Sequence, residues 1–158
     1  MKKTESYIVF NVSRQAFCLS VRYVKSILEL PRVFTVPQAP AYIVGVVNVD
    51  GEVIPLINAG TKMKMQGTEV KENSTIIVLE RIHQAKSQKL CLLIDDVQEV
   101  LDFNEMNLQP LPTSKFEFDE RLVDGMYKAE SDFVMQINVE NFFKHNLEEI
   151  ISLAETTN

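Results

Sequence analysis

Side chains of the kinds that carry out enzymatic chemistry are few in this chain and are scattered along it. The two histidines, His83 and His145, are far apart in the sequence, and neither has a visible catalytic partner. Asp95 and Asp96 could serve acid–base chemistry or bind a metal, but adjacent strand residues point to opposite faces and cannot converge unless the chain bulges. We therefore predict a structural role for this acidic pair.

The motifs of common active sites are also absent from the sequence. It contains no phosphate-binding glycine-rich loop, no Gly-x-Ser-x-Gly nucleophile elbow and no His-Glu-x-x-His zinc motif. Its only cysteines, Cys18 and Cys91, lie in apolar runs without a histidine or second cysteine at ligand spacing, which favours buried free thiols over a disulfide or metal site. We expect a protein that is not an enzyme and that uses no cofactor.

The composition favours a globular protein whose partners are other proteins. The chain has 158 residues, 46% of them apolar and 24% charged, which suits one domain or two small lobes that share a core. Its net charge of −6 argues against nucleic acid and anionic membranes, because both favour a concentrated basic patch. No apolar run approaches the roughly 18 residues of a membrane span, so we expect a cytoplasmic protein without membrane insertion.

The stretch 43–57 predicts a β-hairpin around which the chain is organised. Two apolar runs flank the polar tip Asp50-Gly51-Glu52, and Asp-Gly is a strong turn signal because glycine accepts positive φ without steric cost. Pro55 interrupts the second run and has no N–H to donate. The second strand is therefore predicted to be an edge strand or to bulge at Pro55.

The remainder of the first half is predicted to form short strands and one short helix. Runs 7–12 and 15–21 predict a hairpin, and 32–36 predicts a further strand. Between them, Val21, Val24 and Leu28, with Ile27 beside them, fall on one face of a predicted helix of about two turns. A two-turn helix needs fewer apolar side chains than this to anchor itself, so either some of Val24, Ile27 and Leu28 are exposed for another protein or all three are core.

The second half repeats this organisation without a residue-level repeat. Residues 60–74 predict a mobile connection, in which Met63 and Met65 either fill the loop or contribute to a binding surface. Apolar residues from Phe142 to Ile151 recur at helical spacing. Further strands are predicted at 75–81, 90–103 with a bend near Asp95, 122–128 and 132–137. The pattern predicts a mainly β protein with two small barrel-like lobes and a C-terminal helix.

Several motifs, in their order and spacing, carry a family resemblance. They are Pro37-x-x-Pro40-x-x-Ile43-x-Gly45-Val46-x-Asn48-x-x-Gly51-x-Val53-Ile54-Pro55-x-Ile57, Tyr7-Ile8-Val9-Phe10, Leu93-Ile94-Asp95 with Val97 and Val100, and Gly125 followed by Ile137-Asn138-Val139. Together they resemble the CheW-like domain, which links chemoreceptors to the CheA histidine kinase in bacterial chemotaxis arrays. The resemblance implies a single domain over 1–158, with two five-stranded SH3-like barrel lobes around a shared core. One lobe would span about 6–60 plus the C-terminal helix, and the other about 74–140.

The resemblance also implies a function. A CheW-like protein would be a non-enzymatic scaffold that couples the cytoplasmic tips of chemoreceptors to the regulatory domain of a CheA-type histidine kinase, in chemotaxis or a related motility pathway. It would be a cytoplasmic protein recruited to membrane-associated receptor arrays. The implied receptor-binding residues are Val24, Ile27, Leu28, Asp50, Val97 and Val100, and the apolar residues expected to bind the kinase are Tyr42, Ile43, Val53 and Ile57. No fused receiver domain is expected, because the chain ends soon after Ile151.

A different class of function is a small β-barrel protein that binds RNA or a small ligand. Base-stacking platforms need aromatic residues interleaved with lysine or arginine. The predicted strands offer mostly valine and isoleucine at those positions. The scaffold hypothesis is therefore favoured.

One turn departs from the family pattern. Most CheW-like coupling proteins have arginine in an Asn-Leu-Arg-Gly turn, whereas this chain has Asn48-Val49-Asp50-Gly51, and a position that is often acidic in the family is Ser26. A second acid at position 26 would repel Asp50, so the two changes are physically compatible. We expect either an atypical receptor tip with a basic residue opposite Asp50 or weakened receptor coupling, and the alternative is a neutral, solvent-facing turn.

Overall fold

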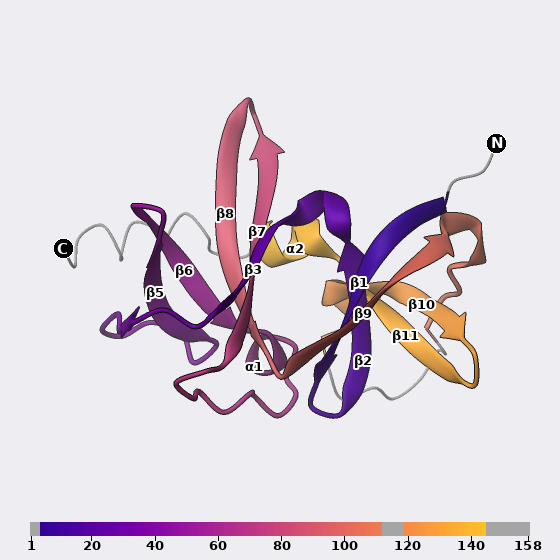
Figure 1. Ribbon diagram of the computed structural model, residues 1–158, viewed down its shortest axis with the longest axis horizontal. Coiled ribbons are helices and arrows are strands. Elements are labelled where there is room, and N and C mark those ends of the chain that lie inside the picture. The colour runs from indigo at the N-terminus through magenta and orange to yellow at the C-terminus, as the bar shows by residue number, and fades with distance from the viewer. Residues whose placement is uncertain (1–3, 112–118, 145–158) are drawn as a thin grey trace.

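The computed structural model describes residues 4–111 and 119–144, and two β-sheets lie side by side in it (Figure 1). Sheet A has the order β10 (Val123–Ala129), β11 (Asp132–Ile137), β2 (Gln15–Ser20), β1 (Thr4–Val12) and β9 (Asp96–Asn104). Sheet B has the order β3 (Val24–Glu29), β7 (Thr75–His83), β8 (Lys86–Ile94), β6 (Glu52–Asn58), β5 (Ile43–Val49) and β4 (Val33–Phe34). The helical elements are short: η1 (Val21–Tyr23), α1 (Ala59–Lys62), η2 (Glu105–Asn107), η3 (Glu120–Leu122) and α2 (Val139–Lys144).

Each sheet receives one edge strand from a hairpin of the other sheet. The hairpin β1–β2 belongs to sheet A, and the chain then passes through η1 into β3, which pairs with β7 in sheet B. The hairpin β7–β8 belongs to sheet B, and after Asp95 the chain enters β9, which pairs with β1 in sheet A. In Figure 1 the chain crosses between the two sheets just before β3 and just before β9. The exchange ties the two sheets together covalently at two points.

Sheet membership therefore differs from the predicted lobes, although the mainly β class is confirmed. The family resemblance implied one lobe over about 6–60 plus the C-terminal helix and another over about 74–140. Instead, β1 and β2 share a sheet with β9, β10 and β11, and β7 and β8 complete the sheet of β3 to β6. Parallel pairing of β2 with β11 and of β6 with β8 causes this arrangement. Such long-range parallel pairs leave no signature in the local sequence pattern.

The two sheets repeat one another in register. Ile43 pairs with Ile57 at one end of β5–β6 and Val49 with Glu52 at the other, while β10–β11 runs from Val123–Ile137 to Ala129–Asp132. Each hairpin is interrupted by a bulge before a glycine, Gly45 or Gly125. A Cβ atom would lie 2.4 Å from the carbonyl oxygen of Phe34 at Gly45 and 2.4 Å from that of Gln109 at Gly125. Both glycines are thus required by a neighbouring segment that crosses close to the bulge.

The helix predicted from Val21 is wrong beyond its first turn. Only Val21–Tyr23 is helical, as the 3₁₀-helix η1, and Val24, Ile27 and Leu28 lie in strand β3. Burial alternates along β3, with the side chains of Val24, Ser26 and Leu28 half-buried and those between them exposed. A window this short fits both periods, and pairing with β7 decides in favour of the strand.

The prediction for Pro55 is also wrong, although the hairpin at 43–57 and its Asp50-Gly51 turn are confirmed. Strand β6 lies inside sheet B, between β5 and β8, and the bulge is at Val44 on β5 rather than at Pro55. Pro55 is tolerated because β8 pairs with β6 only from Leu56 to Asn58. The proline therefore precedes the parallel ladder and removes no bond from it.

The main core lies between the two sheets. It combines aromatic residues such as Phe10, Phe17 and Phe142 with aliphatic residues of both sheets. Met63 is completely buried in this core, so it fills the interior and contributes to no binding surface. The connection that contains it is anchored by Asn58, which caps α1 and bonds both backbone groups of Thr68.

The C-terminal helix is described as far as Lys144. Phe142 and Phe143 of α2 are buried, as their spacing predicted. The remaining predicted helical positions, with His145, lie outside the described residues. Cys18 and Cys91 are buried free thiols, as predicted. No helix in the described part of the chain is long and apolar enough to cross a membrane.

Candidate interaction site

The residues predicted to contact receptors lie on the two exchanged edge strands and at one turn. Val24 and Ile27 of β3 are opposite Leu79 and Ile77, and Val97 and Val100 of β9 are opposite Phe10 and Ile8. Through the internal repeat, Val24 corresponds to Val97 and Ile27 to Val100. The side chain of Ile27 is 41% exposed and that of Val100 is 59% exposed. Val24, Leu28 and Val97 are half-buried against the cores, so each edge strand presents one strongly exposed apolar residue.

The residues predicted to contact the kinase are mostly interior. Ile43 and Ile57 pair with each other at the base of β5–β6 and are 8% and 2% exposed. Tyr42 is half-buried, with the ammonium of Lys62 3.8 Å from the centre of its ring. Val53 is 48% exposed and is the member of this set that can offer apolar surface. Ile43 and Ile57 can support that surface only from beneath.

Asp50 lies in a charged network at the tip of β5–β6. Its backbone φ is 52°, and Asn48 Oδ1 accepts a hydrogen bond of 3.0 Å from the N–H of Gly51. Next to it, Lys89 Nζ lies 2.7 Å from Glu52 Oε1 and 3.8 Å from Glu80 Oε2. The hydrogen bond to Glu52 raises the pKa of Lys89, and the charge of Asp50 acts in the same direction. A cation facing Asp50 is thus already supplied by this chain.

The two positions that depart from the family pattern meet in this network. Ser26 and Asp50 line one small cavity of about 20 Å³, together with Lys25 and Lys89. The hydroxyl of Ser26 therefore stands where a carboxylate would have faced Asp50. Lys25 and Lys89 supply positive charge beside Asp50.

The acidic pair Asp95 and Asp96 has the predicted structural role. Asp95 accepts hydrogen bonds from the backbone N–H of Ser13 at 2.9 Å and from Thr68 Oγ1. Asp96 accepts one of 2.6 Å from Asn11 Nδ2. These contacts fix the crossing from β8 to β9 against the β1–β2 turn. Within the described residues no group of three or more acidic, histidine or cysteine side chains could hold a metal ion.

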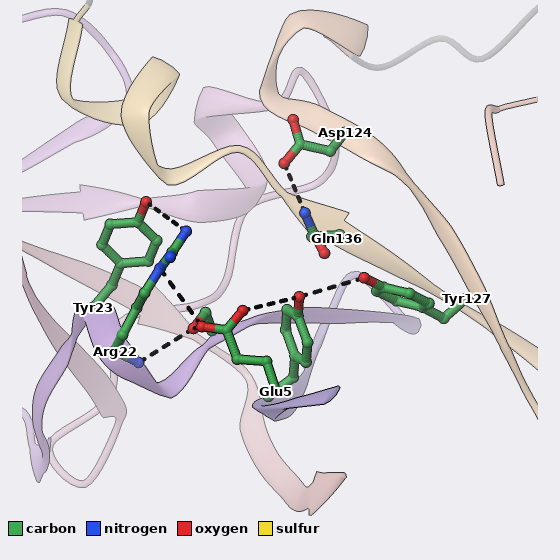
Figure 2. Close-up of polar contacts among 8 residues, drawn as sticks. Glu5, Arg22, Tyr23, Asp124, Tyr127 and Gln136 are labelled. Carbon is green, nitrogen blue, oxygen red and sulfur yellow. Dashed lines mark hydrogen bonds and ion pairs between the residues drawn. The ribbon is translucent and has the colours of Figure 1, made fainter. Parts of the chain in front are cut away.

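A polar cluster that sequence reasoning missed lies at one end of sheet A (Figure 2). The hydroxyl groups of Tyr7 and Tyr127 are 3.3 Å apart, and Tyr7 Oη is 3.5 Å from Glu5 Oε2. Glu5 also accepts a hydrogen bond from Ser20 and lies 3.6 Å from the guanidinium of Arg22. Burial, and then the hydrogen bond to Tyr127, raises the pKa of Tyr7. The phenols therefore stay protonated at neutral pH.

The cluster borders a cavity of about 480 Å³ whose far side is formed by β11 and α2. Across it, Gln136 Nε2 donates a 2.8 Å hydrogen bond to Asp124 Oδ2. A tyrosine in a predicted strand is ordinarily interpreted as a core aromatic residue. A single glutamine between Met135 and Ile137 does not indicate a polar site in the sequence. Only the pairing of β11 with β2 reveals that these polar groups share one end of the sheet.

A second missed feature joins α2 to sheet B. Arg81 is 8% exposed, and its Nη1 lies 2.6 Å from Glu140 Oε1. Its Nε donates a 2.8 Å hydrogen bond to Gln88, and the guanidinium lies over the ring of Phe143 at 4.8 Å. The planar, multiply bonded guanidinium is typical of a buried structural arginine. It fixes α2 against the β7–β8 hairpin.

Comparison with known proteins agrees with this geometry. The model of the CheW-like domain matches residues 6–147. The chain is 29% identical over 136 residues to the chemotaxis protein CheW of Rhizobium meliloti, covering 86% of this chain and 85% of the relative. It is 24% identical over 131 residues to the chemotaxis protein CheW of Bacillus subtilis, covering 83% and 81%. The crystal structure of the scaffolding protein TtCheW from Thermoanaerobacter tengcongensis matches with a TM-score of 0.77 at 24% identity, covering 92% of this chain and 90% of that one.

Two barrel-like sheets, each with a strongly exposed apolar residue on an edge strand, offer surface for protein contacts. The chain belongs to the CheW-like domain family. It has the fold of two SH3-like lobes, and it is a chemotaxis scaffold and not an enzyme.

Proposed function

We propose that this scaffold couples chemoreceptors to a CheA-type histidine kinase by binding the cytoplasmic tip of the receptor and the regulatory domain of the kinase, without ATP or metal. It acts at membrane-associated receptor arrays. The observation that carries the proposal is the pair of equivalent apolar residues, Ile27 and Val100, exposed on the two exchanged edge strands. Exposed apolar side chains on otherwise polar edges are typical of protein contacts.

The receptor is proposed to contact both edge strands. Ile27 and Val100 provide the apolar contacts, Val24, Leu28 and Val97 support them from the half-buried side, and Asp50 lies at the neighbouring turn. A helical receptor tip presents apolar residues at regular intervals and could meet one edge residue from each sheet. The exchange of β3 and β9 keeps these two edges in a fixed relation, which suits a rigid ligand.

The receptor contact is tested by titrating a receptor-tip fragment from the same organism into Ile27→Ser and Val100→Ser. Each substitution is expected to weaken binding about tenfold, because Ile27 and Val100 are proposed as dominant contact residues and truncating such a residue costs roughly 1–2 kcal/mol. Val70→Ser is the matched control, since Val70 is 48% exposed on the connection before β7. Equal affinity of all three variants would remove both edge residues from the site.

The kinase is proposed to contact the β5–β6 hairpin. Val53 offers apolar surface, Tyr42 flanks it, and Ile43 and Ile57 hold the hairpin in shape from the core. Isothermal titration with the regulatory domain of the kinase should give saturable binding that Val53→Asp weakens about tenfold or more. Val70→Asp is again matched, because Val70 and Val53 are equally exposed at 48%. Absence of binding to the native chain would contradict the kinase partnership itself.

A further inference from the structure

The ends of the two sheets that carry the hairpin turns have equivalent cavities. Every residue that lines the small cavity beside Asp50 in sheet B has a counterpart, at the same register position, that lines a cavity in sheet A. Asp50 corresponds to Glu130 and Glu52 to Asp132. The sheet B cavity measures about 20 Å³ and the sheet A cavity about 600 Å³. Equivalent walls thus enclose very different spaces.

Two features accompany the larger volume: the sheet A cavity extends farther along β1 and β9, to Asn11, Asp102 and Phe103, and one shared lining position differs strongly in side-chain size. Lys89 of β8 pairs with Glu80 of β7, and at the same place in sheet A Ala16 of β2 pairs with Asn11 of β1. The Lys89 side chain is only 13% exposed, and it shares its cavity with Ile54 and Val78 while its ammonium bonds Glu52. Lysine commonly lays its methylene groups on apolar surface in this way and keeps its charge at a polar rim. Ala16 is too small to do the same.

The sheet A cavity keeps the surroundings that suit such a lysine. Its interior wall is apolar, with Val134 and Val9 in the places of Ile54 and Val78. Its rim is more acidic than that of sheet B, because Glu99 corresponds to Ser26 and joins the two acids of the turn. Asp102 adds a further acid at the rim, where it accepts a 2.6 Å hydrogen bond from Ser6. Arg14 is the one cationic side chain among the described residues that line it.

We propose that the sheet A cavity binds the side chain of a lysine or arginine supplied by a partner protein. The methylene groups of that side chain would lie on Val9 and Val134, and its cationic group would meet Asp132 and Glu130, as Lys89 meets Glu52 beside Asp50 in sheet B. The proposal rests on the internal counterpart as well as on the acidic rim, since the chain itself shows which side chain such a cavity accepts. None of the side chains proposed to contact the receptor or the kinase lines this cavity, although Gln98 and Glu99 of the same strand β9 do.

A metal ion and a free amino acid fit the cavity less well. The acids at its rim do not form a group that could hold a metal ion within the described residues. An α-carboxylate would be repelled by four rim acids, against one arginine. A protein-borne side chain brings the cation and the methylene groups without that carboxylate.

The test uses the full chain and a blocked lysine, N-acetyl-L-lysine methylamide, followed by NMR chemical shifts. Saturable shifts are expected around Ala16, Glu130 and Asp132, with a dissociation constant on the order of millimolar for so small a ligand. The norleucine derivative, which keeps an unbranched four-carbon side chain but lacks the ammonium group, should not bind measurably. Free L-lysine should bind no more tightly than the blocked form. Markedly tighter binding of free lysine would identify an amino-acid site and overturn the proposal.

Two reciprocal variants make the test specific. Ala16→Lys should fill the sheet A cavity from within and weaken binding at least tenfold, while Lys89→Ala should open the sheet B cavity and add shifts around Asp50. Glu130→Gln with Asp132→Asn alters only exposed side chains and should weaken binding even if Ala16→Lys does not fold. Absence of shifts in the native chain, or shifts that survive the acid substitutions, would overturn the proposal.

Discussion

Sheet A and sheet B share their strand order and register, yet their smaller cores are chemically different. Beneath sheet B the side chains are aliphatic, including Ile76, Val47 and Leu56. The corresponding positions of sheet A are Tyr7, Tyr127 and Gln136. The rings of Phe103 and Tyr127 stack there at 4.4 Å. The same backbone therefore accepts either an aliphatic interior or an aromatic one with a polar end. The features that recur in both sheets, such as the glycines at the two bulges, are those that the backbone itself requires.

The largest expected effect concerns those shared backbone features. Gly45→Ala and Gly125→Ala should each lower the free energy of unfolding by about 3 kcal/mol, because a Cβ atom would collide with a carbonyl oxygen of the crossing segment. Urea denaturation followed by circular dichroism measures both. Gly51→Asn is the control, since no atom lies within 4 Å of a Cβ there and asparagine tolerates the positive φ. A small effect at one glycine only would show that the two bulges are not equivalent.

The next effect tests whether the two sheets protect their cysteines equally. Cys18 and Cys91 occupy equivalent positions and are completely buried, and burial raises the pKa of each thiol to about 12. A disulfide reagent at about pH 8 should modify both thiols at least about a hundredfold more slowly in the native protein than in urea, because only an exposed thiolate reacts. The variants Cys18→Ala and Cys91→Ala each keep one thiol, so that the labelling rates of the two cysteines can be compared. A faster rate at one of them would identify the sheet that opens more readily.

A smaller effect distinguishes the polar interior of sheet A from its aliphatic counterpart. Tyr7→Phe should lower the free energy of unfolding at pH 7 by about 1 kcal/mol, the usual net value of a hydrogen bond. Tyr7→Phe combined with Tyr127→Phe should cost less than the two single changes together, because they share one bond. Val53→Thr, at an exposed strand position of sheet B, serves as the control. Strict additivity would show that the two hydroxyl groups act independently.

The pH dependence of the same pair has a definite sign. Burial raises the pKa values of Tyr7 and Tyr127, so above about pH 10 the unfolded chain loses these protons while the folded chain keeps them. The unfolded state then binds fewer protons, and the free energy of unfolding falls as the pH rises. Urea denaturation between about pH 9 and pH 11 should show this decline, and Tyr7→Phe should make it less steep. An unchanged slope would indicate that the thiols cause it.

Local patterns predicted the elements better than their assembly. The hairpin at 43–57 and the buried cysteines follow from residue types within a few positions of each other. The helix predicted through Val24 failed because a six-residue window satisfies both periods, and the edge-strand prediction for Pro55 failed because the partner β8 is distant in sequence. The same long-range pairing hid the sheet membership.

The candidate site also has a part that could be predicted from the sequence and a part that depends on long-range strand pairing. The family resemblance named Ile27 and Val100 as receptor-binding residues, and the structure shows both side chains exposed on edge strands, while their role stays a prediction. The sequence and the resemblance could not identify the polar cluster around Tyr7 or the cavity beside Ala16, because both lie between strands that meet only through the pairing of β2 with β11. The cavity also depends on alanine in sheet A at the position that Lys89 holds in sheet B.

The smallest expected effect on stability concerns Asp50. Asp50→Arg places a second cation beside Lys89 and should lower the free energy of unfolding slightly, and adding Ser26→Glu should restore it to within about 0.5 kcal/mol, because exposed charge pairs contribute little. The expected effect on binding is larger. If the native turn is adapted to an atypical receptor tip, the double variant should bind ordinary tips, those that suit the family arginine, about tenfold more tightly than the native chain.

Sheet A provides the matched control for this exchange. Glu130 corresponds to Asp50 and Glu99 to Ser26, so Glu130→Arg alone creates the same kind of acid–arginine pair at the other turn. If Asp50 determines specificity, that variant should change receptor binding much less than the exchange at Asp50 does, because Glu130 is not among the proposed receptor contacts. Titration of one receptor-tip fragment into the three proteins measures the effect. If the native chain binds that tip as tightly as the double variant does, Asp50 does not determine specificity, and the turn is only a solvated counterpart of the one at Glu130.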